Sequence, residues 1–296
     1  MELFDKQLKD LLSVFGGIQH YQRIVENNTK KLINDLVKAK ASLEVLDDQA
    51  KDVFGSSVNA FYFYSPYTGT ATPYDAKKTS IDEAIELTFL HKNKQYQWLL
   101  TEAYEAYEDY LEAMYACAGF IDPSFWPVKD LESQDPSSVK SLGFQWFLEK
   151  SRNKRGAPGT IMAHFRKDLP NFANIERNNL TGNDLRLAMS IIEKIRHIIV
   201  HKNGKTDVRE HVIDTILKSA NILNNKRLEP IARSIVSENF GKGEYNGLVI
   251  LVEKPMLQSN GISMTINRHD YLLGAMLGHS LVLRNELVAL FSKGAT

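Results

Sequence analysis

Apolar residues recur with a helical period along most of this chain, most clearly between residues 81 and 118. One broad face of this segment is apolar and comprises Leu87, Leu90, Tyr96, Leu99, Leu100, Ala103, Tyr107, Leu111, Met114 and Ala118. The opposite side is acidic and comprises Glu102, Glu105, Glu108, Asp109 and Glu112. The pattern predicts a long amphipathic helix. We expect its aromatic stripe to pack in the core, because acidic neighbours make a poor surface for stacking RNA bases.

The same periodicity predicts further helices before and after this segment. They cover residues 2 to about 50, about 138–152, a short stretch around 164–167, about 184–203, about 207–237 and 269–291. We expect the first to consist of two pieces, broken near Gly16 and Gly17. Polar residues at 181–184 form a capping cluster for the fourth, and Asn203-Gly204 is typical of a helix end.

Two regions depart from the helical pattern. Residues 53–80 are rich in Gly, Ser, Pro, Thr and Tyr, which predicts an irregular connection with short strand character. Residues 245–252 and 262–266 resemble two short strands, with a turn at 255–261. The predicted fold is an all-α helical bundle with an N-terminal helical extension and a small β-hairpin insertion near 245–267. We place an N-terminal arm and irregular connection at 1–80 and a helical domain at 81–296.

Composition narrows the possible functions. The chain has 296 residues and 36 basic against 36 acidic side chains, so nucleic acid could bind only at a local patch. The single cysteine, Cys117, excludes an internal disulfide, and we expect it to be an inert core thiol. The first residues lack the pattern of a secretory signal, and no window approaches about 18 uninterrupted apolar residues. We therefore expect a soluble, cytoplasmic protein with no membrane partner.

The most informative polar residues lie at 191–204, in the last turns of a predicted helix. There Arg196, His197 and His201 stand among apolar neighbours. A guanidinium group can hold a phosphate through two hydrogen bonds, and an imidazole can move a proton near neutral pH. His197 and His201, four residues apart, share a helix face, whereas Arg196 and His201 are about 140° apart in projection. The combination suits phosphodiester chemistry, and the helix dipole favours a cationic His201 in the last turn.

Other interpretations of this segment remain open. The cation and the imidazoles could cap helix carbonyls or form surface ion pairs. Glu193, His197 and His201 form a stripe that could approach a zinc ion, but its outer members are about 12 Å apart along the helix. Protein ligands bind zinc at about 2 Å, so one ion cannot reach all three without other residues. We expect no metal and no cofactor.

A basic loop precedes this segment in the sequence. Arg152, Lys154 and Arg155 lie within 151–159, which is bounded by Gly and Pro. These cations could contact phosphates and bind substrate. A solvated basic loop without a functional role is the alternative.

Residues 196–201, RHIIVH, resemble the Arg-polar-x-x-x-His signature of the HEPN superfamily, all-helical domains of many prokaryotic toxin and antiviral ribonucleases. The continuation 201–204, HKNG, is also similar to prokaryotic members. The motif ends one long helix, follows another at 81–118 and precedes a third at 269–291. The resemblance covers about residues 81–292, and the N-terminal arm and predicted hairpin lie outside it.

The resemblance implies a helical bundle that forms a homodimer, with two motifs facing each other across a cleft, and metal-independent cleavage of RNA. His201 would be the general acid or base, Arg196 would stabilise charge on the phosphorane, and His197 would orient the phosphate or the partner motif. By their positions beside the motif, Glu193 could hold the Arg196 guanidinium and Asn203 could contact phosphate or backbone. An antitoxin or a companion defence protein is a further implied partner.

Two alternatives to the ribonuclease remain. The first is a non-catalytic module of the same fold that binds RNA, a nucleotide or a partner protein. The second is a helical scaffold in which Arg196 and His201 are ordinary capping residues.

Overall fold

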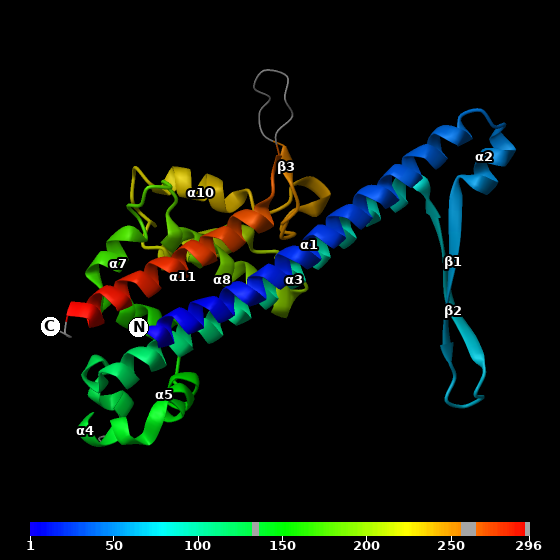
Figure 1. Cartoon of the computed structure of the whole chain (residues 1–296). Helices are drawn as coiled ribbons and strands as arrows, with labels where there is room; N and C mark the ends of the chain where they lie inside the picture. Colours follow the sequence, from blue (N-terminus) through cyan, green and yellow to red (C-terminus); the bar gives the residue numbers. More distant parts are fainter. Residues whose placement is uncertain (132–135, 256–264, 294–296) are drawn as a thin grey trace. The chain divides into compact units, whose positions relative to one another are not determined.

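The computed structural model describes residues 1–131, 136–255 and 265–293, and these are mostly α-helical, as predicted (Figure 1). The helices are α1 (Glu2–Leu43), α2 (Asp48–Phe54), α3 (Ile81–Ile121), α4 (Pro136–Val139), α5 (Gly143–Arg152), α6 (Gly159–Asp168), α7 (Pro170–Ile175), α8 (Leu185–Lys202), α9 (Arg209–Ser219), α10 (Glu229–Ser237) and α11 (Arg268–Lys293). The strands are β1 (Ser56–Tyr64), β2 (Ala71–Ser80), β3 (Lys254–Pro255) and β4 (Thr265–Ile266). Single 3-10 turns lie at Pro123–Phe125, Val128–Leu131, Lys140–Leu142 and Gly243–Tyr245.

The chain forms two compact units. The larger unit contains Met1–Gln19 and Tyr96–Thr296, and the smaller contains His20–Gln95. Both α1 and α3 contribute residues to each unit, so the boundaries fall inside helices. The division that the sequence suggests, at residue 80, lies at the start of α3 and not at a boundary between the two units. A change of periodicity marks the end of a secondary-structure element, whereas the units are defined by packing.

Helix α1 is continuous, so the predicted break at Gly16 and Gly17 is wrong. Each glycine inside a helix costs about 1 kcal/mol relative to alanine. Burial of the apolar stripe on both sides of the pair outweighs this cost. The stripe comprises Phe4, Leu11, Phe15 and Ile18, each no more than 3% exposed.

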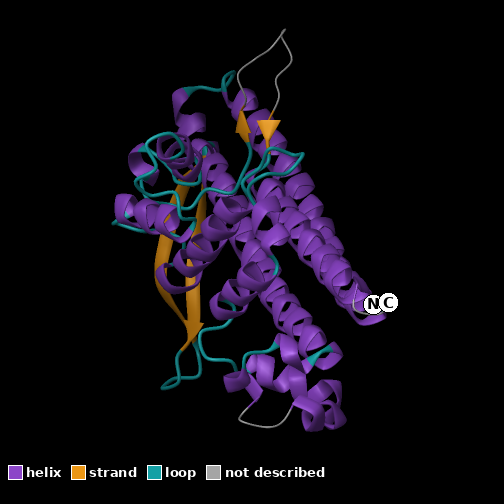
Figure 2. Ribbon diagram, turned by 90° about the vertical axis from the view of Figure 1, so that its left-hand side faces the viewer, coloured by secondary structure: helices purple, strands orange, loops and turns teal. Residues whose placement is uncertain are grey.

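The smaller unit contains a regular hairpin where the sequence predicts an irregular connection (Figure 2). Strands β1 and β2 pair antiparallel from Ser56 opposite Ser80 to Tyr64 opposite Ala71, with a register shift between Phe61 and Tyr62. Nearly every residue of both strands is exposed. Because neither face is buried, the strands lack the alternation of apolar and polar residues that identifies a half-buried sheet.

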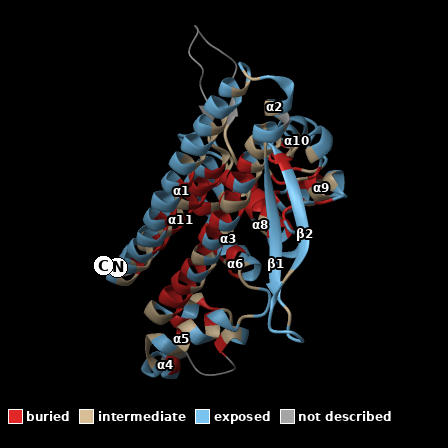
Figure 3. Ribbon diagram, turned by 90° about the vertical axis from the view of Figure 1, so that its right-hand side faces the viewer, coloured by how far each residue is buried: buried red, intermediate tan, exposed pale blue. Residues whose placement is uncertain are grey.

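The core of the larger unit lies along α3 and α8, where buried residues concentrate (Figure 3). From Tyr96 onward the predicted apolar face of α3 is buried, which confirms that its aromatic stripe packs internally. Helix α8 packs against α9 and α11. Cys117 is a buried free thiol, and burial raises its pKa to about 12, as expected of an inert core residue.

Three other segments differ in detail from the predicted elements. The helix expected at 207–237 is interrupted between α9 and α10, where Asn221 and Asn224 adopt positive φ angles of 57° and 68°. The helix expected at 138–152 is divided among α4, a 3-10 turn and α5. In the expected hairpin near 245–267, the paired strands are only β3 and β4. Leu248 and Val249 form isolated β-bridges with Lys205 and Phe240 and not with the second expected strand, and 256–264 lie outside the described residues.

We expect the start of α11 to make the fold sensitive to acid. His269 is fully buried, its ring lies 5.3 Å from that of Tyr96, and burial lowers its pKa to about 4. An unfolded histidine binds a proton below about pH 6.5, whereas this one stays neutral until about pH 4. We expect the free energy of unfolding to fall by about 3 kcal/mol between these pH values because of His269 alone.

The measurement is urea unfolding of the wild type and of His269→Gln at several pH values. The variant should lose less stability on acidification than the wild type. Equal pH dependence of the two proteins would show that His269 does not produce the acid sensitivity.

Candidate functional site

Helix α8 carries the predicted motif and has defined ends. At its start, Asp184 accepts a hydrogen bond at 2.8 Å from the backbone N–H of the third helical residue. At its end, Asn203 adopts the left-handed conformation with φ 52°, and the Gly204 N–H donates to the Ile198 carbonyl at 3.1 Å. The predicted helix end at Asn203-Gly204 is therefore confirmed, and it places His201 in the last turn.

Gly204 fixes the end of α8 against the rest of the larger unit. It is buried at φ +79°, and a Cβ there would lie 2.4 Å from Oε1 of Gln97. The other side of that amide donates to the Val249 carbonyl at 2.8 Å. Gln97 on α3 thus joins the end of α8 to the segment before β3.

Arg196 is held at the surface by a residue of α3. Its Nη2 lies 3.4 Å from Oε1 of Glu105, and its Cζ lies 6.0 Å from the ring centroid of Tyr104. The side chain is 25% exposed, while its Nε is buried and has no hydrogen-bond partner among the described residues. One nitrogen of the guanidinium group is therefore occupied and another is buried, so the group is only partly accessible to a ligand.

The two histidines form a pair on the exposed face of α8. The ring centroids of His197 and His201 are 4.6 Å apart, and both side chains are exposed. Partial desolvation lowers the pKa of His197, and the neighbouring His201 and nearby cations lower it further. The lowered pKa favours the neutral form of His197, which is the form with a free ring nitrogen that can accept a proton.

Within one chain, no hydrogen bond joins Arg196 to His201 in the described part of the molecule. The five-residue separation directs the two side chains to different sides of the helix, as the projection predicts. Within one chain, the two members of the predicted catalytic pair are therefore near in sequence but are not joined by a direct hydrogen bond.

The structure does not show the ion pair with Arg196 that we expect of Glu193. Its carboxylate lies 2.9 Å from Nζ of Lys194, and Glu105 occupies the position beside Arg196. Glu105 comes from the side of α3 that we expect to face solvent, and it does remain exposed while it makes this ion pair. Asn203 is exposed and serves as the left-handed cap of α8, so its conformation has a structural cause independent of substrate.

The cations of the basic loop are directed away from Arg196. Lys154 forms an ion pair with Asp130 and lies 5.5 Å from the ring centroid of Tyr115, so it is a structural residue. Arg155 lines a second cavity, which also includes Asp130. Arg152 is exposed at the end of α5. The structure therefore does not bring this group of cations to the motif.

Instead, the following backbone 156–159 reaches a cavity that contains Arg196. The cavity has a volume of about 380 Å³ and lies between α3, the start of α6 and α8. Arg196, His197 and Glu193 line it from α8, and Glu108 lines it from α3. Burial raises the pKa of Glu108, and three neighbouring carboxylates add to the increase while Arg196 opposes it.

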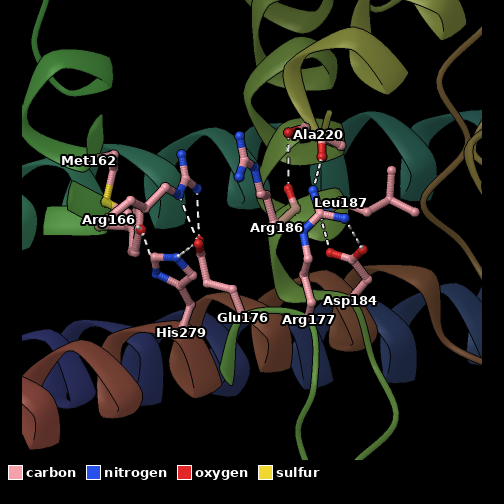
Figure 4. Close-up of polar contacts among 11 residues, drawn as sticks. Met162, Arg166, Glu176, Arg177, Asp184, Arg186, Leu187, Ala220 and His279 are labelled. Carbon is pink, nitrogen blue, oxygen red and sulfur yellow. Dashed lines mark hydrogen bonds and ion pairs between the residues drawn. The ribbon is translucent and has the colours of Figure 1, made fainter. Parts of the chain in front are cut away.

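A buried polar network forms another wall of this cavity (Figure 4). Arg166 donates to both carboxylate oxygens of Glu176, from Nε at 2.8 Å and from Nη2 at 2.7 Å. Nε2 of His279 lies 2.9 Å from Oε1 of the same carboxylate, and Nδ1 lies 2.8 Å from the Tyr107 hydroxyl. Glu176 and His279 are fully buried, whereas the Arg166 side chain is 25% exposed.

The network keeps Glu176 ionised. Burial alone would raise the pKa of this carboxyl, but hydrogen bonds from His279 and Arg166 lower it to about 2. Burial also raises the pKa of Tyr107 well above its usual range, so that phenol stays protonated. The network therefore fixes Arg166 by a charged, bidentate contact at the cavity wall.

Sequence reasoning missed this network, although one signal was present. His279 occupies a stripe on α11 that is otherwise apolar and buried, together with Leu272, Met276 and Leu283. A polar residue at such a position requires a buried partner. Its partner Glu176 lies 103 residues earlier, so periodicity within α11 could not identify it.

Comparison with protein-family models, with curated proteins and with solved structures gives no match for this chain. No helix in the described ranges is long and apolar enough to cross a membrane. The described side chains also contain no cluster of three or more His, Cys, Asp or Glu residues arranged to hold a metal ion.

Proposed function

We propose that the protein is a metal-independent endoribonuclease of the HEPN type, with a role in prokaryotic defence or as a toxin. The observation that carries the proposal is the end of α8. There a partly accessible guanidinium group and His197, one of two paired and exposed imidazoles, line a cavity large enough for part of a nucleotide. These are the groups that a phosphodiester transfer reaction requires.

The proposed reaction uses the RNA itself as the nucleophile. The ribose 2′-oxygen attacks the adjacent phosphorus while an imidazole, His201, removes its proton. The bond from phosphorus to the 5′-oxygen then breaks, and that oxygen takes up a proton. The products are a 2′,3′-cyclic phosphate and a 5′-hydroxyl. Arg196 stabilises the negative charge that develops on the phosphorane oxygens.

We further propose that the working unit is a homodimer. A single chain directs Arg196 and His201 to different sides of α8. A second copy related by a twofold axis can supply the missing group, so that each phosphate meets an arginine of one protomer and a histidine of the other. Isologous contacts of this kind are the commonest way in which identical chains associate.

The test is incubation of the purified protein with mixed single-stranded RNA, with and without EDTA, followed by analysis of the product ends. We expect cleavage in both conditions and 2′,3′-cyclic phosphate ends. Cleavage that requires a divalent ion, or products with 3′-hydroxyl ends, would contradict the proposal. RNA that is bound but not cleaved under any condition would instead support a non-catalytic binding module of the same fold.

A further inference from the structure

Positive charge is not fully balanced next to the cavity beside Arg196. Three arginines, Arg166, Arg177 and Arg186, lie around two carboxylates, Glu176 and Asp184 (Figure 4). Arg166 is paired with Glu176. Arg177 lies 3.6 Å from Asp184 and also donates to a backbone carbonyl. One guanidinium group, that of Arg186, therefore remains without an anionic partner.

No polar contact of the Arg186 side chain with a described residue stabilises the fold. Its guanidinium group makes no hydrogen bond or ion pair with any described residue, and its buried Nε has no partner. Figure 4 shows the guanidinium group of Arg186 in the same cluster as those of Arg166 and Arg177. In agreement with this, burial lowers the pKa of Arg186, and repulsion from Arg166 and then Arg177 lowers it further. Arg186 is only partly buried, so its charge can remain there without a partner, and an anionic ligand would supply the counter-ion that the described residues do not.

Arg166 offers a second free donor at the same place. Glu176 occupies its Nε and Nη2, and the third nitrogen, Nη1, points away from Glu176 (Figure 4). No described residue accepts a hydrogen bond from Nη1. Because Glu176 is itself fixed by His279, Arg166 is held in position before any ligand binds, which lowers the cost of binding.

A polar stripe on α8 connects this cation pair to the proposed reaction centre. Residues spaced three and four apart share one helix face, and here they are Arg186, Ser190, Glu193, His197 and His201. Ser190, Glu193 and His197 line the cavity, and the last three members of the stripe are exposed to solvent or nearly so. The stripe extends over about 22 Å of helix, which is long enough for several nucleotides of extended RNA.

We propose that Arg166 and Arg186 bind a backbone phosphate of the RNA substrate, about 20 Å along α8 from His201. The proposed function enters this inference only in the choice of RNA as the anion. Each guanidinium group donates to phosphate oxygens through nitrogens that the fold leaves free. RNA would thereby be held in register along the stripe, with the scissile phosphate at the C-terminal end of α8.

The test compares the wild type, Arg186→Gln and the control Arg227→Gln, which removes an exposed arginine from the loop between α9 and α10. Binding of a fluorescent 2′-O-methyl RNA of about 12 nucleotides, which cannot be cleaved, is measured by anisotropy at several salt concentrations. For Arg186→Gln we expect Kd to rise about tenfold and the slope of log K against log salt to become shallower by about 0.7. The control should bind like the wild type.

Thermal unfolding separates binding from folding. Removal of an unpaired cation relieves its repulsion with Arg166, so Tm of Arg186→Gln should equal or exceed that of the wild type. Wild-type RNA affinity and salt slope in Arg186→Gln, or a clearly lowered Tm, would overturn the proposal. If inorganic phosphate raises Tm of the wild type but not of the variant while RNA affinity is unchanged, the site binds free anions and the assignment to RNA is wrong.

These outcomes are distinguishable from failure of the proposed function. RNA binding that depends on Arg186 in a protein that never cleaves RNA would reject the ribonuclease and leave the phosphate site in place. RNA cleavage by a protein whose RNA affinity does not depend on Arg186 would reject the phosphate site and leave the ribonuclease in place.

Discussion

Replacing His201 with alanine is expected to lower the rate of RNA cleavage by about 10²–10⁴-fold, the usual contribution of a general acid or base. The side chain is exposed and its ring lies 4.6 Å from that of His197, so the fold should survive the substitution. The measurement is single-turnover cleavage of a labelled RNA, with the circular dichroism spectrum as the check on folding.

The matched control is His211→Ala, because His211 is an exposed histidine on the neighbouring helix α9. It should cleave RNA at the wild-type rate. Full activity in His201→Ala would reject the assigned role of this residue.

Arg196 provides a second variant on the same centre. Arg196→Lys keeps the positive charge but loses the planar fork that donates two parallel hydrogen bonds, so we expect a loss of about 10²–10³-fold in kcat. An activity close to that of the wild type would show that Arg196 supplies charge alone.

Replacing Glu176 with glutamine is expected to lower the free energy of unfolding by about 3–5 kcal/mol, the largest effect on stability that we foresee. The substitution removes the charge that Arg166 and His279 share in a fully buried position. Arg166 would then be left without its counter-ion. Urea unfolding at pH 7 measures the change.

Glu102→Gln is the control for this variant, because Glu102 is an exposed carboxylate on α3 and its loss should change stability by less than about 0.5 kcal/mol.

The stabilising contribution of Glu176 also depends on pH in a defined direction. Its pKa of about 2 lies below the value of an unfolded glutamate, so the contribution is complete above about pH 4.5 and is lost as the pH falls towards 2. Equal free energies of unfolding for Glu176→Gln and Glu102→Gln would show that the buried charge of Glu176 does not stabilise this part of the fold.

The local periodicity of apolar residues predicts much of the fold correctly. It fails where contacts between residues distant in sequence determine the structure. The buried face of α3 and the end of α8 at Asn203 follow from neighbouring residues alone, and both were predictable. The continuity of α1 through Gly16 and Gly17 depends on packing of its apolar stripe, which composition does not reveal. The hairpin of β1 and β2 has no buried face, so its sequence lacks the usual signature of a strand.

The candidate site divides in the same way. A short motif placed Arg196, His197 and His201 on one helix end, as found. The ion partner of Arg196 is 91 residues away, and the two residues that fix Arg166 come from the turn after α7 and from α11. Contacts of this kind exist only once α3, α6, α7, α8 and α11 are packed together, so the pattern of a single segment could not predict them.

The close approach of Gly204 to Gln97 makes the end of α8 sensitive to substitution at a buried residue. A single added methyl group at residue 204 cannot fit without displacing the amide that joins α3 to Val249. The last turn of α8 would shift and would move the imidazole of His201, even though the substitution is at Gly204 and leaves His201 itself unchanged. Even a small movement of a reacting group can reduce turnover severely, so a substitution at this buried position would lower the proposed activity while leaving the reacting groups intact.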